Sequence, residues 1–199
     1  MSKQLWDERY AAHEIVYGYE PNVFFKEQLD RLTPGKLLLP AEGEGRNALY
    51  AASRGWEVTA YDFSEVAREK TLKRAREKQL AIDYFVDDLT AANFQESTFD
   101  SVGLIFAHLP AHQRRDFHRK CLRALKPGGT LILEGFSKEQ LAFQSGGPKD
   151  EAMLFDEDML RKDFQDLYSI RLQKLQITLQ EGPFHQGPAA VIRLTGVKA

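Results

Sequence analysis

The chain has 199 residues and a formal net charge of -2, with 43% hydrophobic and 28% charged residues. This composition is typical of a folded globular protein, so we expect a single domain over residues 1–199 rather than a fibrous or largely disordered chain. The small net charge argues against a nucleic-acid partner, because binding to a phosphate backbone needs a basic surface.

Cysteine content and hydropathy exclude further classes. The only cysteine, Cys121, permits no intrachain disulfide and no cysteine metal cluster, and we expect it in the core and no metal site in the chain. No apolar run reaches the roughly 18 residues that a membrane span needs, and the first residues lack the apolar core of a signal peptide. We therefore expect a cytoplasmic protein without membrane contact.

Short β-like runs alternate with amphipathic helical patterns after an aromatic-rich segment that ends at Phe25. This alternation predicts right-handed βαβ units and a parallel sheet. The expected strands are 36–39, 57–63, 83–86, 100–107 and 130–134, and the expected helices are 46–54, 64–79 and one around 117–125.

The last third of the chain changes character. A helix around 157–167 precedes two long β-like runs, 170–180 and 189–197, joined only by residues 181–188. No crossover helix fits between them, so the two strands must be antiparallel. The expected fold class is α/β: a doubly wound, Rossmann-like, seven-stranded and mostly parallel sheet that ends in an antiparallel hairpin.

A glycine-rich turn follows the first expected strand and opens a helix. Gly43, Gly45 and Ala48 satisfy the dinucleotide pattern G-x-G-x-x-G/A, and Asp62 ends the second strand, where an acid would hold ribose hydroxyls. Taken alone, this pattern fits a nicotinamide-dependent oxidoreductase and a nucleoside-binding methyltransferase equally well.

The charge of the loop distinguishes between these two hypotheses. Glu42 and Glu44 flank Gly43, and only Arg46 offsets them, whereas a pyrophosphate needs neutral or positive surroundings. S-adenosylmethionine carries a sulfonium and an ammonium beside one carboxylate, so acidic residues suit it. The alternative, that the glutamates complement the helix dipole from solvent, fits Glu44 better than Glu42.

A third acid follows the third strand. The Asp88 carboxylate is placed to accept the adenine amino group while the next backbone N–H, that of Leu89, reaches a ring nitrogen. The alternative is a loop-capping Asx turn.

Together these residues resemble the class I S-adenosylmethionine-dependent methyltransferases, most closely the tellurite-resistance and thiopurine methyltransferase-like branch. The resemblance covers nearly the whole chain and rests on residues 43–48, Asp62 with Ser64, Asp88-Leu89, residues 106–110, residues 125–129 and Glu181-Gly182…His185…Gly187. It implies that the glycine loop receives the methionine part, the acid after strand two the ribose, and Asp88 the adenine. The expected cofactor-binding residues are Arg9, Glu42, Gly43, Gly45, Asp62, Phe63, Ser64, Asp88, Leu89 and Phe106.

The chain departs from the family pattern in the glycine loop. The family usually has an acid where Leu39 stands, a glycine where Ala41 stands and a small residue where Glu42 stands. We infer that Glu42 partly replaces the missing acid near the ammonium of the cofactor or in a nearby loop.

The methyl acceptor is expected to be a small molecule. A soft thiol, selenium or tellurium nucleophile would need no base, whereas an oxygen or amine nucleophile can use a histidine. His108, after the fourth strand, and His185, in the terminal turn, are the candidate catalytic residues; we expect His13, His112 and His118 to be solvated.

Residues 1–30 are rich in aromatic side chains beside glycine and proline, which suggests a lid over the ligand. In similar enzymes an arginine of this segment meets the cofactor's carboxylate, and Arg9 is the expected residue. A helix docked on the sheet explains Phe24 and Phe25 equally well. The chain is expected to act as a monomer or weak homodimer; a nicotinamide-dependent oxidoreductase and a non-catalytic nucleoside-binding module are the competing functions.

Overall fold

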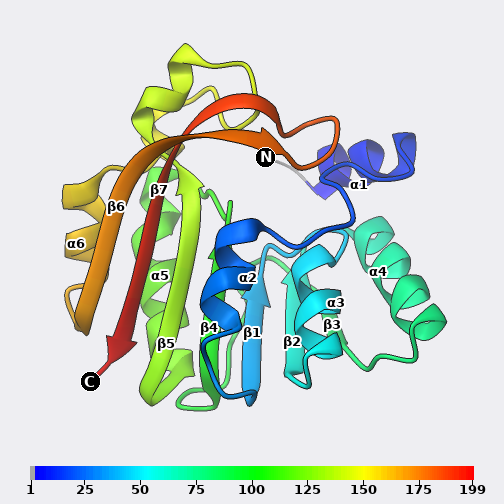
Figure 1. Ribbon diagram of the computed structural model, residues 1–199, viewed down its shortest axis with the longest axis horizontal. Coiled ribbons are helices and arrows are strands. Elements are labelled where there is room, and N and C mark those ends of the chain that lie inside the picture. Colours follow the sequence, from blue (N-terminus) through cyan, green and yellow to red (C-terminus); the bar gives the residue numbers. More distant parts are fainter. Residues whose placement is uncertain (1–2) are drawn as a thin grey trace.

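The computed structural model describes residues 3–199 and contains one seven-stranded sheet in the order β3-β2-β1-β4-β5-β7-β6 (Figure 1). Strands β1 to β5 run parallel to one another, and β7 runs antiparallel to both β5 and β6. This confirms the expected fold class. The strands are β1 Lys36–Pro40, β2 Glu57–Asp62, β3 Asp83–Val86, β4 Phe99–Ile105, β5 Leu125–Phe136, β6 Leu167–Gln180 and β7 Gln186–Lys198.

Helices cover both faces of the sheet, as the doubly wound pattern predicts (Figure 1). Helices α2 to α4 pack on one face and α5 and α6 on the other, while α1 lies beyond the carboxyl ends of the strands. The helices are α1 Lys3–Ala12, α2 Val23–Leu29, α3 Arg46–Ser53, α4 Glu65–Glu77, α5 Ala111–Ala124 and α6 Glu157–Asp163, with 3-10 turns η1 Lys138–Ala142 and η2 Glu151–Met153. Within residues 3–199, no helix has both the length and the apolar composition to cross a membrane.

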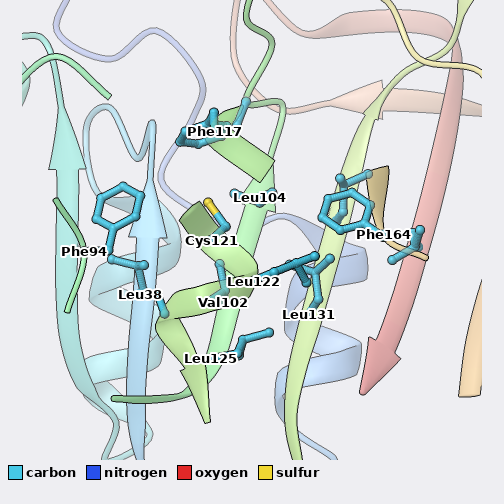
Figure 2. Close-up of a cluster of buried hydrophobic side chains, with 14 of the residues drawn as sticks. Leu38, Phe94, Val102, Leu104, Phe117, Cys121, Leu122, Leu125, Leu131 and Phe164 are labelled. Atoms are coloured by element: carbon cyan, nitrogen blue, oxygen red, sulfur yellow. The ribbon is translucent and has the colours of Figure 1, made fainter. Parts of the chain in front are cut away.

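The larger core lies between the sheet and α5 with α6. Phe117 and Cys121 of α5 pack toward Leu38 and Val102 of the central strands (Figure 2). Cys121 is fully buried, as expected for a core residue, and burial raises the pKa of its thiol far above the ordinary value. Each such apolar side chain contributes about 1.5–3 kcal/mol when it leaves water.

A second core lies under α2 and α3 on the opposite face. Phe24 and Phe25 of α2 are buried there beside Leu39 and Ile105. Of the two expectations for these phenylalanines, the docked helix is therefore right and the lid is wrong. The aromatic residues that remain available for a lid belong to α1 and the loop that follows it.

The expectation that His118 is solvated is wrong. Its ring is fully buried between α5 and α6, with Nδ1 2.9 Å from the carboxylate of Asp163, which also accepts from Arg114 at 2.8 Å. Burial lowers the pKa of His118, although the neighbouring carboxylate opposes that shift. Helix α6 ends at Asp163, earlier than the sequence pattern suggested.

The strand order fixes where a ligand can bind. From β1 the chain proceeds outward through β2 and β3, then returns to place β4 on the other side of β1. The loops after β1 and β4 therefore diverge to opposite faces at the carboxyl edge, and this divergence opens a crevice for ligands.

Candidate active site

A cavity of about 390 Å³ lies at this carboxyl edge, between the strand ends and the N-terminal segment. All of the predicted site residues line it except Gly45 and Ser64. The acids after β2 and β3 face one part of the cavity, whereas residues that follow β4 and β5 and the β6–β7 turn face the other part. The sheet order places β2 and β3 on one side of β1, and β4, β5 and β7 on the other, so the two groups of residues border different parts of one cavity.

The two glycines of the loop make room mainly for protein groups. Gly43 and Gly45 have φ values of 59° and 75°, a region that side chains other than glycine rarely adopt. A Cβ on Gly45 would lie 2.2 Å from a methyl carbon of Thr71, and one on Gly43 would lie 2.5 Å from the hydroxyl of Tyr10. The loop is thus packed between α4 and α1, and only Gly43 also faces the cavity.

Glu42 is buried at the start of α3. Its carboxylate accepts from the backbone N–H of Ala48 at 2.7 Å and from the amide of Asn47 at 3.4 Å. Burial raises the pKa of Glu42 to about 7, although these hydrogen bonds oppose the shift. The side chain lines the cavity as a carboxylate that a nearby cation would keep ionised.

Glu44 has a different role from the solvent-exposed one that we preferred for it. It is buried, accepts from the backbone N–H of Val16 at 2.8 Å and pairs with Lys70 at 2.9 Å. The ammonium of Lys70 also donates to the carbonyl oxygens of Tyr10 and His13. Glu44 and Lys70 therefore fasten the N-terminal segment over the glycine loop.

Asp62 ends β2 and connects two loops. Its carboxylate accepts from the backbone N–H groups of Gly43 at 2.9 Å and Ser64 at 3.0 Å. Burial raises its pKa to about 6. A carboxylate has about four acceptor sites, so acceptor capacity remains for a hydroxyl group of a ligand.

Ser64 does not reach the cavity. Its hydroxyl accepts from the N–H of Ala67, which makes it the N-cap of α4, and donates to Asp7 of α1 at 2.5 Å. Ser64 is fully buried in these contacts. Ser64 therefore caps helix α4 and does not take its predicted role in binding the cofactor. The same sequence pattern, an acid followed two residues later by serine, is also typical of the start of a helix.

The loop after β3 combines both of its sequence interpretations. Asp88 Oδ1 accepts from the N–H and the hydroxyl of Thr90 at 2.8 and 2.7 Å, which is the Asx turn. Its other oxygen and the N–H of Leu89 have no hydrogen-bond partner among residues 3–199. This pair, which lines the cavity beside Phe63, keeps one acceptor and one donor available to a planar base.

Arg9 belongs to α1 and lines the cavity. Its guanidinium stacks 4.7 Å from the ring of Trp6 and 5.3 Å from that of Phe184, and it donates to the hydroxyl of Tyr17 at 3.2 Å. No carboxylate of residues 3–199 lies within ion-pair distance of it. An anionic group in the cavity would give Arg9 its missing partner.

His108 is not placed to act as a base. Its Nδ1 lies 2.8 Å from the carbonyl oxygen of Met153, and its Nε2 accepts from the backbone N–H of Phe136 at 3.0 Å. Burial lowers its pKa to about 4. We correct the predicted catalytic role of His108: both ring nitrogens are occupied by backbone groups, and only the ring itself borders the cavity.

His185 differs from His108 in having one free nitrogen. Its Nδ1 lies 3.2 Å from the carboxylate of Glu181, while its Nε2 has no hydrogen-bond partner among residues 3–199. The rings of Tyr17, Phe106 and Phe136 surround it, with centroids 4.5, 4.6 and 5.3 Å away. Phe106 holds this place with a φ of 53°, a backbone strain of the kind found at functional sites.

Sequence reasoning missed the polar network behind His185. Glu181 pairs with Arg46 at 2.9 Å and accepts from the amide of Asn22 at 3.0 Å. Asn22 also donates to Glu134 of β5, which pairs with Arg193 of β7. The Glu181-Gly182…His185 pattern contained Glu181 and His185, but nothing in the spacing indicates that Arg46 and Asn22 meet Glu181.

Comparisons with known proteins show what the chain is similar to. The family model described as "Methyltransferase domain" matches residues 40–129, which run from the end of β1 into β5. In the part of the chain that the structure describes, no group of three or more His, Cys, Asp or Glu side chains is arranged to hold a metal ion.

Two curated relatives differ in how much of the chain they match. Demethylmenaquinone methyltransferase from Renibacterium salmoninarum is 32% identical over 105 residues, 52% of this chain and 43% of the relative. Thiopurine S-methyltransferase from Legionella pneumophila is 24% identical over 202 residues, 90% of this chain and 88% of the relative. The chain spans about half the length of the first curated relatives it matches.

Among solved structures, TehB from Haemophilus influenzae has the same fold. The two superpose with a TM-score of 0.70 and 20% identity, over 99% of this chain and 67% of the other.

Proposed function

We propose that the chain transfers a methyl group from S-adenosylmethionine to a small molecule, because a methyltransferase domain model matches residues 40–129 and solved structures of methyltransferases share the fold. The observation that carries this proposal is the distribution of charge around one cavity. A cationic group, hydroxyls and a planar base would find partners along one part of it, and the other part leaves space for an acceptor.

The side chains fit the cofactor group by group. Arg9, which lacks a carboxylate partner, would hold the cofactor's carboxylate, and Glu42 would face its ammonium. The remaining acceptor sites of Asp62 suit the ribose hydroxyls. The free oxygen of Asp88 and the free N–H of Leu89 suit the adenine edge. When bound, S-adenosylmethionine supplies a methyl carbon on a positively charged sulfur.

The chain's own residues then have three tasks. The lid residues Trp6 and Tyr17 cover the cavity and exclude water, and Phe106 borders the middle of it. His185 lines the cavity, and its Nε2, which has no partner among residues 3–199, could accept a proton from an acceptor. Holding nucleophile and methyl group close and aligned can supply about 7–11 kcal/mol of the barrier reduction.

The sequence suggests a soft thiol, selenium or tellurium nucleophile, or an oxygen or amine nucleophile that uses a histidine. The names of the two curated relatives give a thiopurine and a demethylmenaquinone as acceptors of those proteins. For this chain they support a small organic acceptor. The loop acid Glu42, which has no cation paired with it among residues 3–199, counts against a nicotinamide cofactor, because its ionised form would repel the pyrophosphate.

Isothermal calorimetry tests the proposal. We expect S-adenosylmethionine and its demethylated product to bind, and NADH not to bind. Binding of NADH alone would reject the proposal in favour of an oxidoreductase. Cofactor binding without transfer to any of a panel of thiol, selenite, tellurite and hydroxyl acceptors would support a non-catalytic nucleoside-binding module.

A further inference from the structure

The orientation of His185 in the β6–β7 turn allows only one tautomer of its neutral ring to donate a hydrogen bond to Glu181. Nδ1 of His185 lies 3.2 Å from the carboxylate of Glu181, which can only accept a hydrogen bond when ionised. The proton of the neutral ring therefore resides on Nδ1, and the lone pair of Nε2 is free. Nε2 belongs to a side chain that lines the cavity.

Glu181 is held ionised by its surroundings. Burial by itself would raise its pKa, but the hydrogen bond from His185 and the guanidinium of Arg46 together lower it to about 2. The amide of Asn22 donates to the same carboxylate at 3.0 Å. Residues from α3 and from the loop before α2 thus fix a carboxylate behind the imidazole, an arrangement that stabilises the ring after it accepts a proton.

The wall beside His185 is apolar. Tyr17, Phe106 and Phe136 place aromatic rings around the imidazole. A Cβ on Gly146 would lie 2.8 Å from Cδ2 of His185, and one on Gly147 would lie 2.8 Å from the ring of Phe136. These two glycines keep the loop close to both rings without a side chain in the way.

The cations near His185 both have assigned partners once the cofactor is bound. Arg46 is paired with Glu181, and Arg9, which has no carboxylate partner among residues 3–199, is the residue proposed to hold the carboxylate of the cofactor. With the cofactor in place, an anionic acceptor such as selenite would meet the Glu181 carboxylate and, in the part of the chain that the structure describes, no unpaired cation at this nitrogen. Aromatic walls suit a flat, uncharged molecule, and the nucleophile of that molecule must carry a proton if Nε2 is to accept one.

We propose that the acceptor is an uncharged aromatic compound with a hydroxyl nucleophile, that His185 is the base that takes the hydroxyl proton, and that Glu181 is the residue that positions His185. This inference rests on the proposed methyltransferase function and narrows its acceptor, away from the soft anions that need no base.

The step balances in atoms and electrons. The acceptor oxygen forms a bond to the methyl carbon while the carbon–sulfur bond breaks, and both electrons of that bond stay on sulfur. The hydroxyl proton moves to Nε2 of His185, whose positive charge lies beside the Glu181 carboxylate. After the methyl ether leaves, His185 releases the proton to solvent.

Nuclear magnetic resonance of the imidazole tests the binding part without turnover. With ¹⁵N-labelled histidine and the demethylated cofactor bound, we expect His185 to show the Nδ1–H tautomer. Addition of 1-naphthol should shift the Nε2 resonance, and sodium selenite should not. A His185 in the Nε2–H form, or an Nε2 that responds to selenite and not to naphthol, overturns the inference.

Kinetics with the same probes test the chemistry. His185→Gln should lower transfer to 1-naphthol by roughly 10²–10⁴-fold, the usual effect of removing a general base. Glu181→Gln should slow transfer and shift the pH at which the rate rises, which a purely structural role would not do. The groups that set this pH are Glu181, Arg46, Arg9, Tyr17 and His108.

The control is His112→Gln, which removes an exposed histidine at the start of α5 that does not line the cavity. Calorimetry with the demethylated cofactor shows whether each variant is folded and competent to bind. Wild-type protein that binds no cofactor would reject the proposed function itself. Cofactor binding with transfer to selenite that His185→Gln leaves unchanged would reject only the present inference.

Discussion

Nε2 of His108 accepts a hydrogen bond from the backbone N–H of Phe136 at 3.0 Å, and the opposite ring nitrogen meets the carbonyl oxygen of Met153. The imidazole therefore links the end of β5 to the 3-10 turn before α6. Each buried backbone group left unpaired costs about 1–3 kcal/mol. We expect His108→Leu to lower the free energy of unfolding by about 2–4 kcal/mol in urea denaturation, whereas the control His112→Leu should have no effect.

The lowered pKa of His108 predicts that the free energy of unfolding falls as the solution becomes acidic. Because burial lowers it from 6.5 to about 4, the unfolded chain binds a proton first as the pH falls. The stability that neutral His108 contributes is present above pH 6.5 and is lost toward pH 4. The stability of His108→Leu should therefore decline less than that of the wild type over this interval; an equal decline would contradict the assigned role.

We expect the carboxyl group of Glu42 to release a proton when the cofactor binds. Its pKa of about 7 leaves the carboxyl group partly protonated at neutral pH, and a cation beside it favours the ionised form. Binding at pH 7 should release roughly half a proton, detected by calorimetry in two buffers of different ionisation enthalpy. Glu42→Gln should abolish the release and weaken binding. Tighter binding of the cationic cofactor by this variant would refute the charge argument.

The same carboxyl group lowers the stability of the ligand-free protein as the pH rises. A folded-state pKa above the ordinary 4.5 favours folding at low pH, and that contribution is lost between pH 4.5 and 7. Glu42→Gln should therefore be more stable than the wild type at pH 8 by about 1–3 kcal/mol. The exposed Glu57→Gln serves as the matched control.

Asp62 should contribute to both binding and loop structure. Asp62→Ala removes the acceptor of two backbone N–H groups as well as the expected ribose ligand. We expect a loss of roughly 1–3 kcal/mol in affinity for S-adenosylmethionine by calorimetry, together with a lower melting temperature. Asp83→Ala, an exposed acid at the start of β3, is the control. Unchanged affinity would mean that the ribose lies elsewhere.

Lys70 should control the lid. Its ammonium holds three backbone carbonyls of residues 10–14 and the carboxylate of Glu44. Lys70→Met keeps the stem and removes these bonds, so amide hydrogens of residues 10–16 should exchange faster and the cofactor should dissociate faster. Lys73→Met, on the exposed side of α4, should change neither. Equal exchange in the two variants would show that Lys70 does not fasten the lid.

Ala41 carries backbone strain that glycine would relieve. Its φ of 57° lies in the left-handed region, where a residue with a Cβ is disfavoured by about 1–2 kcal/mol. Glycine loses more entropy on folding, so the net gain of Ala41→Gly should be about 0.5–1 kcal/mol in urea denaturation. A destabilised variant would indicate that contacts of the Ala41 methyl group outweigh the strain.

The periodicity of the sequence was sufficient for the fold. Apolar runs such as residues 37–39 and 102–105 are long enough for buried strands, and the helices between them leave only a parallel arrangement. The glycine pattern and Asp62 likewise located the site, because ligands of such sheets bind at the carboxyl ends of the central strands. These inferences depend on local spacing, which the sequence contains.

The roles of individual side chains depended on contacts between distant segments. His108 and His185 both follow strand ends, yet one has two backbone partners and the other has a carboxylate and a free nitrogen. From the sequence we expect Glu44 to be solvated, but α1 and Lys70 cover it in the folded protein. Sequence by itself determined which elements form and where a ligand can lie. Only the tertiary structure decided which polar atoms remain available there. Burial and hydrogen bonding set the pKa of each side chain and determine which of its donors and acceptors stay unpaired.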